Sequence, residues 1–397
     1  MLITFRSIVV LAVTGVVASV LTACGGQAPA AVGASSLPCG AGQGPVVLAV
    51  SGRMGSPRPA LTAPMQSVVE QAVRGGHPVL VVSLDGKPEL VPTPAPVSVN
   101  VNSGALVGVV ATAVTGVAGV VSHVRANDPE VDDVAGLSLA AAAGRAAGPG
   151  TPTVILADSA LQTAGALNYA QPGMVVASAA DVTGFLASSG QEAQDKGAVV
   201  LLSGVGDTVA PQVGLTNAEK TQLRNTWSEI AKQGGASCVA VLDAPASNQG
   251  VTDVPPVSLV PVPAAPQLTP QVRAPIDLGQ SQVAFNPDAA TFVDPASVQE
   301  TLTPLATQLG ADTRVRVTLT GATSSATGTG GPSSEDLSRQ RAQAVADVLV
   351  SLGVGTDRIT VVGAGSTFAG FVPDRSPDGV LLPGPAAQNR KVIVTFR

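Results

Sequence analysis

Five short apolar runs, each of a length suited to a buried strand, recur between residues 45 and 243. Helical patterns separate them: Thr62–Arg74 and Thr216–Gln233 carry apolar residues at helical spacing, and each ends at a pair of glycines. Strands that alternate with helices favour a parallel sheet that is covered on both faces. We therefore expect a doubly wound, Rossmann-like α/β domain over residues 45–243. Its strands are Val46–Val50, Val79–Leu84, Thr153–Ala157, Ala198–Ser203 and Ser237–Leu242.

The uncharged stretch Gly104–Val121 allows two interpretations. It is long enough to cross a membrane. It consists mostly of Gly, Ala, Val and Thr, however, and it lacks aromatic or basic flanks. We expect a helix that packs within the α/β domain, followed by a second, alanine-rich helix at Asp132–Ala147.

A change in composition at residue 244 predicts a domain boundary. Prolines recur through residues 244–278 and predict a semi-rigid linker, because proline fixes the backbone and removes donors. The remaining residues, 279–397, mix both patterns and predict an α+β domain of typical size. The expected strands are Ser281–Phe285, Arg314–Gly321, Arg358–Val362 and Lys391–Phe396, and the expected helices are Pro295–Leu309 and Ser334–Leu352.

The first residues read as an export signal. One positive charge in Met1–Arg6 precedes the apolar run Ile8–Leu21. The run ends in Leu21-Thr22-Ala23-Cys24, which resembles the lipobox of bacterial lipoproteins. The resemblance implies cleavage after residue 23, diacylation of Cys24, and a lipid-anchored protein on the outer side of a cell membrane. Residues 24–44 would form the tether. The alternative is an ordinary secretory signal with an incidental cysteine.

Charge and residue counts argue against several function classes. The net charge of −6 argues against nucleic-acid binding. Only two histidines, His77 and His123, are present, so a histidine-based active site or metal site is not expected. The sequence has no nucleophile elbow and no P-loop. We expect no enzyme activity, no cofactor and no metal.

Two cysteines remain after Cys24 is assigned to lipid. Cys39 precedes the first strand and Cys238 begins the last strand of the α/β domain. The starts of parallel strands lie at the same edge of a sheet, so an oxidising compartment favours a Cys39–Cys238 disulfide. The alternative is two separate buried thiols.

The C-terminal segment resembles the OmpA-like domain, a module that attaches envelope proteins non-covalently to peptidoglycan. The residues that carry the resemblance are Phe285, Leu302, Leu305, Leu309, Leu319-Thr320-Gly321, the run from Leu337 to Ala342, Val345, Leu349, Arg358-Ile359, Gly363-Ala364-Gly365 and Asn389-Arg390-Lys391-Val392.

The resemblance implies roles for individual residues. Arg341 would bind the carboxylate of the diamino acid in the peptide stem, which suits the planar guanidinium fork. Asn389 and Arg390 would shape the rim of the pocket. The family carries an aspartate where this chain has Ser324, so peptidoglycan binding is expected to be weak. The alternative for Arg341 is a structural salt bridge.

The α/β domain resembles, more faintly, the von Willebrand factor A (vWA) fold. The segments that carry this resemblance are Val47–Gly55, Ile155–Ser159 and Gly204–Asp207. The metal-ligand positions of that family hold Ala49, Ser51 and Arg53 here, which leaves too few oxygen ligands for a cation. Ser51, Arg53, Asp158 and Asp207 would then line a crevice for a protein partner. An internal Arg–Asp pair in place of the metal is the alternative.

Together, these observations predict a two-domain envelope lipoprotein. Its C-terminal domain would bind peptidoglycan, and its N-terminal domain would bind an unidentified protein partner. The alternatives are an extracytoplasmic small-molecule binder, which would use the crevice at the strand ends, and a wall-polymer hydrolase, which the absence of a nucleophile–base pair disfavours.

Overall fold

The first of two sheets is six-stranded and almost entirely parallel. The computed structural model describes residues 37–93, 102–244, 247–263, 274–325 and 333–397. The strands of the first sheet lie in the order β3-β2-β1-β4-β5-β6, and only β3 runs antiparallel to its neighbour. Their bounds are β1 Val46–Val50, β2 Val79–Ser83, β3 Glu89–Val91, β4 Thr153–Ala157, β5 Val199–Ser203 and β6 Cys238–Leu242. The expected parallel sheet is therefore present.

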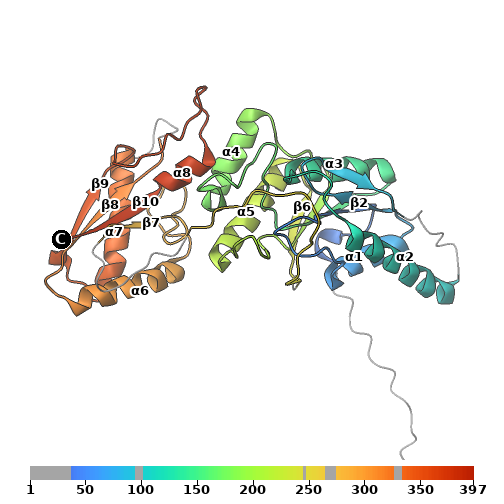
Figure 1. Ribbon diagram of the computed structural model, residues 1–397, viewed down its shortest axis with the longest axis horizontal. Helices are drawn as coiled ribbons and strands as arrows, with labels where there is room; N and C mark the ends of the chain where they lie inside the picture. Colours follow the sequence, from blue (N-terminus) through green and yellow to red (C-terminus); the bar gives the residue numbers. More distant parts are fainter. Residues whose placement is uncertain (1–36, 94–101, 245–246, 264–273, 326–332) are drawn as a thin grey trace, which may run out of the picture. The chain divides into compact units, whose positions relative to one another are not determined.

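Both faces of this sheet are buried, as β1 shows. Val47 and Ala49 belong to one apolar core, whereas Val46, Leu48 and Val50 belong to the core on the opposite face. Helices on the two faces exclude water from these cores (Figure 1). On one face lie α1 Ala63–Arg74 and α2 Ser103–His123, and on the other lie α3 Asp133–Ala147, α4 Ala179–Ser189 and α5 Asn217–Gln233.

Local signals fix the ends of several of these helices. α5 begins with a capping box, in which Thr216 and Glu219 satisfy each other's backbone donors, and it ends at Gly234. Asp132 caps α3 by accepting a hydrogen bond from the Ala135 backbone. The single-turn helices η1 Pro38–Gly40 and η2 Met174–Val176 complete this part of the chain.

Part of the expected linker packs against the first sheet. Val251, Val257 and Val260 are buried. Ser258 donates two hydrogen bonds to the Glu130 carboxylate, from its backbone nitrogen at 3.0 Å and from its hydroxyl at 2.8 Å. Residues 247–263 therefore belong structurally to the first sheet region, defined here as residues 37–263, because valines between the prolines give this segment apolar surface to bury.

The second sheet region, residues 274–397, contains four strands in the order β7-β10-β8-β9. The strands are β7 Ile276–Leu278, β8 Val317–Ala322, β9 Ile359–Gly363 and β10 Lys391–Phe396; the helices are α6 Pro295–Ala311, α7 Ser334–Ser351, the single turn η3 Thr356–Arg358 and α8 Pro383–Asn389. Leu302, Leu319, Val345 and Leu349 are fully buried in its core.

One strand prediction is wrong. Residues 281–285 form no strand, and the edge strand is instead β7. The backbone N–H groups of Gln282 and Val283 both donate to the Gly279 carbonyl, at 3.0 and 2.9 Å, so the chain turns where a strand was expected. Gly279, two residues before the expected strand, allows the turn.

Candidate functional site

Arg341 lies on the buried side of α7 in the second sheet region. The side chain of Ser333 caps this helix by accepting from the Asp336 backbone, and Leu349 two turns further on anchors it in the core. Arg341 itself is only 6% exposed. The same helical spacing that buries the apolar stripe therefore also buries the guanidinium.

Arg341 is held by carbonyl oxygens and by an aromatic ring. Nε donates to the Ala289 carbonyl at 2.9 Å, and Nη2 donates to the Asn286 carbonyl at 3.3 Å. The guanidinium carbon lies 5.2 Å from the centre of the Phe285 ring. No carboxylate among the described residues pairs with it, so the salt bridge considered as its alternative role is not found there.

The electrostatic consequence is an under-compensated cation. Burial, together with the nearby Arg390, lowers the pKa of the Arg341 guanidinium to about 10, and Asp288 acts in the opposite direction. The group remains charged at neutral pH. A buried cation without a counter-ion is costly unless an anion joins it, so this position favours a carboxylate or similar ligand.

A small cavity of about 20 Å³ opens beside this guanidinium. A volume of this size accommodates about one water molecule or the end of a carboxylate group. Three of its lining side chains are cations, and two of them already have carboxylate partners: Lys391 pairs with Asp277 at 2.6 Å, and Arg390 pairs with Asp181. Its lining residues are Gln280, Phe285, Ala322, Arg341, Arg390 and Lys391.

Ser324 faces Arg390 in this structure. The Ser324 hydroxyl accepts from Arg390 Nε at 3.1 Å, and the other two guanidinium nitrogens bond to both oxygens of Asp181. Asp181 belongs to α4 of the first sheet region. A carboxylate from a distant part of the chain therefore reaches the surroundings of Ser324.

Asn389 has a structural position rather than a place in the cavity. It is fully buried, its Oδ1 accepts from the Val372 backbone nitrogen at 2.9 Å, and its Nδ2 donates to the Val372 carbonyl at 2.7 Å and to Asp374 at 3.0 Å. Asp374 also accepts from the backbone and hydroxyl of Ser325. Asn389 and Asp374 thus join the backbone at Val372 to that at Ser325, and neither of them lines the cavity.

The other site residues predicted from sequence lie at the carboxyl ends of strands β1 and β4. Arg53 Nη2 donates to Asp158 at 2.9 Å and to the Ser159 hydroxyl at 2.6 Å, and the Ser56 hydroxyl donates to Asp158 at 2.7 Å. Although burial alone would raise it, Arg53 holds the pKa of Asp158 below its usual range. Burial, together with the nearby Asp158, raises the pKa of Asp133 well above its usual value. Arg53 therefore pairs directly with Asp158, while Asp133 lies buried close to that pair and holds its proton more tightly than an exposed aspartate.

That geometry differs from the expected partner crevice. Ser51, Arg53 and Asp158 are each at most 4% exposed, so their side chains face the interior. Asp207 makes a separate ion pair, with Lys220, at 2.7 Å. The internal Arg–Asp pair considered as the alternative describes Arg53 and Asp158 better, because a buried ion pair needs no outside partner.

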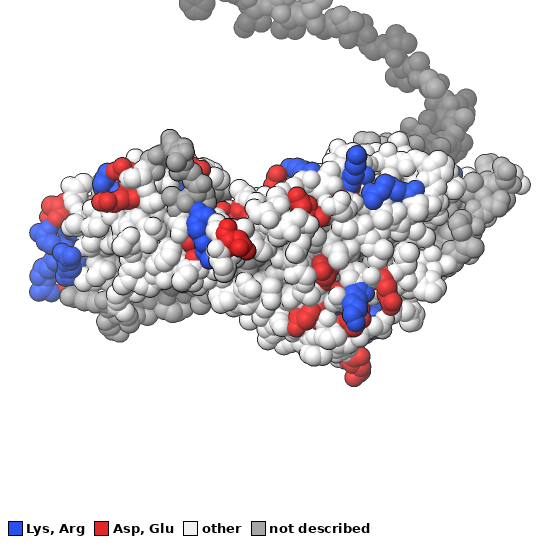
Figure 2. Space-filling view, turned by 90° about the horizontal axis from the view of Figure 1, so that it is seen from above, with Lys and Arg blue, Asp and Glu red and all other residues white. Residues whose placement is uncertain are grey.

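The structure also brings the two remaining cysteines together. A disulfide joins Cys39 to Cys238. Their Cα atoms are 6.0 Å apart, which is a usual separation for such a bond. Cys39 lies within η1, which packs beside β6 at the strand-start edge of the sheet. On the face that Figure 2 shows, acidic and basic side chains form small, separate groups.

Comparison with known proteins supports the family resemblance for the C-terminal part only. No curated protein sequence matches the chain. Similar solved structures include the periplasmic domain of Helicobacter pylori MotB, at 20% identity, a TM-score of 0.26, and coverage of 31% of this chain and 80% of that one. They also include the peptidoglycan-associated lipoprotein from Burkholderia pseudomallei, at 24% identity, a TM-score of 0.24, and coverage of 29% and 88%. Residues 284–378 match the OmpA family, and this part of the chain is an OmpA family domain.

Proposed function

We propose that this protein is a cell-envelope lipoprotein whose OmpA family domain binds peptidoglycan non-covalently. The observation that carries the proposal is the buried Arg341, which has no carboxylate partner among the described residues and lines a cavity that fits a carboxylate end. The ligand would be the free carboxylate of the diamino acid in a peptide stem. Such a ligand would supply the anion that this cation lacks.

We further propose that the affinity is modest. Ser324 offers a hydroxyl where the family offers a charge, and a charge-assisted hydrogen bond contributes about 1.5–3 kcal/mol. Asp181 does not simply replace that charge, because both of its oxygens bond to Arg390. Arg341 would then carry most of the recognition, with Arg390 and Ser324 beside it and Asn389 supporting the loop.

The pull-down of the mature protein with purified peptidoglycan tests this proposal. Two stem-peptide fragments serve as matched competitors, one with the free carboxylate on its diamino acid and one with that carboxylate amidated. We expect the protein to sediment with peptidoglycan and the free-acid fragment to displace it. Equal displacement by the amidated fragment would contradict a role for Arg341 in carboxylate recognition.

The anchor at Cys24 remains a proposal, since residues 1–36 lie outside the described part of the chain. Membrane fractionation of a Cys24→Ala variant tests it. We expect release from the membrane or a block in processing, because the diacyl chains of lipoproteins make the tether stable and one chain alone would not. Membrane association that persists and still requires detergent for release would rule out the lipobox.

The first sheet region is proposed as a vWA-like module for protein interactions. Its strand order and its helices on both faces are those of a doubly wound fold, which supports this assignment. With Ser51, Arg53 and Asp158 buried, the part of the proposed crevice that remains accessible is near Asp207. The Cys39–Cys238 disulfide would stabilise this module, and titration of free thiols in the oxidised, purified protein tests it.

A further inference from the structure

Helix α2 exposes an apolar surface that the fold does not use. Its segment Gly104–His123 has a mean hydropathy of 2.1, and only 17% of this apolar stretch is buried. Val110, Val117 and Val121 face the core, whereas Val107 is 60% exposed. A surface helix in water normally has a polar outer face, so an apolar outer face indicates contact with a partner or a membrane.

Three hydroxyls of α2 donate within the helix itself. The hydroxyls of Thr112 and Thr115 donate to the carbonyls of Gly108 and Ala111, each at 2.9 Å, and the Ser122 hydroxyl donates to the Gly119 carbonyl at 2.9 Å. These hydroxyls therefore need no water partner. Such internal bonding is what an apolar environment requires of a helix.

The helix is attached to the first sheet region along one side. Its buried stripe packs against α1 and β2 in the same core as Leu37 and Cys39, where the described chain begins. If Cys24 carries lipid, the chain from Cys24 to Leu37 spans at most about 45 Å. The described chain therefore begins, within reach of the proposed anchor, in the core that α2 covers.

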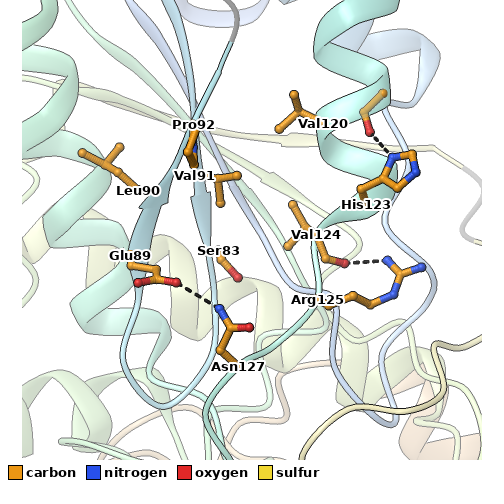
Figure 3. A pocket seen from close by; sticks show the side chains of 11 residues that line it. Ser83, Glu89, Leu90, Val91, Pro92, Val120, His123, Val124, Arg125 and Asn127 are labelled. Carbon is orange, nitrogen blue, oxygen red and sulfur yellow. Dashed lines mark hydrogen bonds between the residues drawn. The ribbon is translucent and has the colours of Figure 1, made fainter.

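A groove of about 590 Å³ lies at the C-terminal end of α2, next to the edge strand β3 (Figure 3). Leu90, Val91 and Val120 line one part of it, and Arg125 lies in the other part. The Arg125 guanidinium donates only to the Ser122 and Val124 carbonyls, and it has no carboxylate partner among the described residues. The groove also contains the Glu89 carboxylate, which accepts a hydrogen bond from Asn127 Nδ2 at 3.0 Å. An apolar wall beside a cation without an ion-pair partner still suits the headgroup region of an anionic lipid.

We propose that α2 lies flat on a phospholipid bilayer, with its outer face among the acyl chains and with an anionic headgroup at Arg125. This proposal rests on the proposed function in one respect: the lipid anchor at Cys24 would keep the protein close to a bilayer. The binding of α2 to the bilayer does not itself require the lipid. Because the helix is apolar along about 30 Å, the contact would orient the whole first sheet region on the membrane. Peptidoglycan binding by the other region is a separate property.

Vesicle co-sedimentation of the full mature chain without its lipid tests the proposal, with Cys24→Ala as the background. The vesicles contain phosphatidylcholine alone, or phosphatidylcholine and phosphatidylglycerol in equal parts. We expect binding to both, and tighter binding to the anionic vesicles. Val107→Asp would weaken binding by at least about tenfold, since it replaces a valine that would lie among the acyl chains with a charged side chain. Arg125→Gln would abolish the preference for anionic vesicles.

Val213→Asp is the matched control, because Val213 is 64% exposed and lies away from α2 in the loop before α5. It would bind like the parent chain. Circular dichroism checks that each variant is folded. Parent chains that stay in the supernatant, or a Val107→Asp variant that binds as well as its parent, would overturn the proposal. So would a dimer in analytical ultracentrifugation that Val107→Asp dissociates, since a second copy would then cover α2.

Discussion

Two buried arginines, one in each sheet region, meet different surroundings. Arg53 bonds directly to the ionised Asp158 and to Ser159. Arg341 meets only two carbonyl oxygens and the face of Phe285. Both are nearly inaccessible to solvent, at 3% and 6% exposure. The first is neutralised by a direct ion pair, whereas the second has no carboxylate in contact with it in the described part of the chain.

The difference separates a structural arginine from a binding arginine. A buried ion pair is complete, and removing one partner leaves the other as an uncompensated charge. A buried cation that is bonded only to neutral groups gains from any anion that reaches it. The two arginines are almost equally buried, so burial does not distinguish their roles. The roles differ because Arg53 bonds to a carboxylate and Arg341 bonds to carbonyl groups.

The largest expected effect concerns the Arg53 pair. Arg53→Ala leaves Asp158 buried without its cation, so we expect the free energy of unfolding to fall by about 3–5 kcal/mol. Arg341→Ala strands no carboxylate and is expected to cost much less. Urea denaturation measures both, with the exposed Arg58→Ala as the control. An equal loss of unfolding free energy in Arg53→Ala and Arg341→Ala would contradict the distinction between a structural and a binding arginine.

A third buried ionisable group, the carboxyl of Asp195, extends the comparison, because neither of its oxygens has a hydrogen-bond partner. Burial raises the pKa of Asp195 to about 7, with a weak opposing effect from Arg145. The folded state then holds its proton more tightly than the unfolded state. We expect the free energy of unfolding to fall as pH rises from about 4 to about 7, by up to about 4 kcal/mol.

Asp195→Asn removes that titration. Chemical denaturation across this pH range is expected to show a variant that loses less stability with rising pH than its parent and is the more stable of the two above pH 7. Identical pH profiles for parent and variant would mean that Asp195 is ionised in the folded protein without cost.

The smallest expected effect concerns Ser324. We expect Ser324→Asp to strengthen peptidoglycan binding about tenfold, because it adds a charge-assisted contact. Ser324→Asn has a similar size but no charge and serves as the control in the same binding isotherm. The same affinity for Asp and Asn at this position would show that Arg390, which already bonds to Ser324, absorbs the new charge.

Local patterns predicted most of the framework. Apolar runs located β1, β2, β4, β5 and β6, and periodicity located α6 and α7. The short, exposed β3 carries no such pattern, so it was missed. Helix α8 was missed as well, because its packing against η2 comes from residues about two hundred positions away.

The site could be predicted only in part for the same reason. The family pattern indicated Arg341, Ser324 and Arg390. No motif indicated Asp181, which reaches Arg390 from 209 positions away, or Asp374, which holds Asn389 in place. Patterns within one chain segment identify residue types on a face, but partners from distant segments appear only in three dimensions.

The most direct measurement is the binding isotherm of Arg341→Gln on purified peptidoglycan, beside the parent chain. Arg314→Gln is the control, since the Arg314 side chain is 90% exposed on the same sheet region. If Arg341 binds the stem carboxylate, Arg341→Gln binds at least about tenfold more weakly, while the control binds like the parent. An Arg341→Gln variant that is folded and binds with the parent's affinity would contradict the central claim.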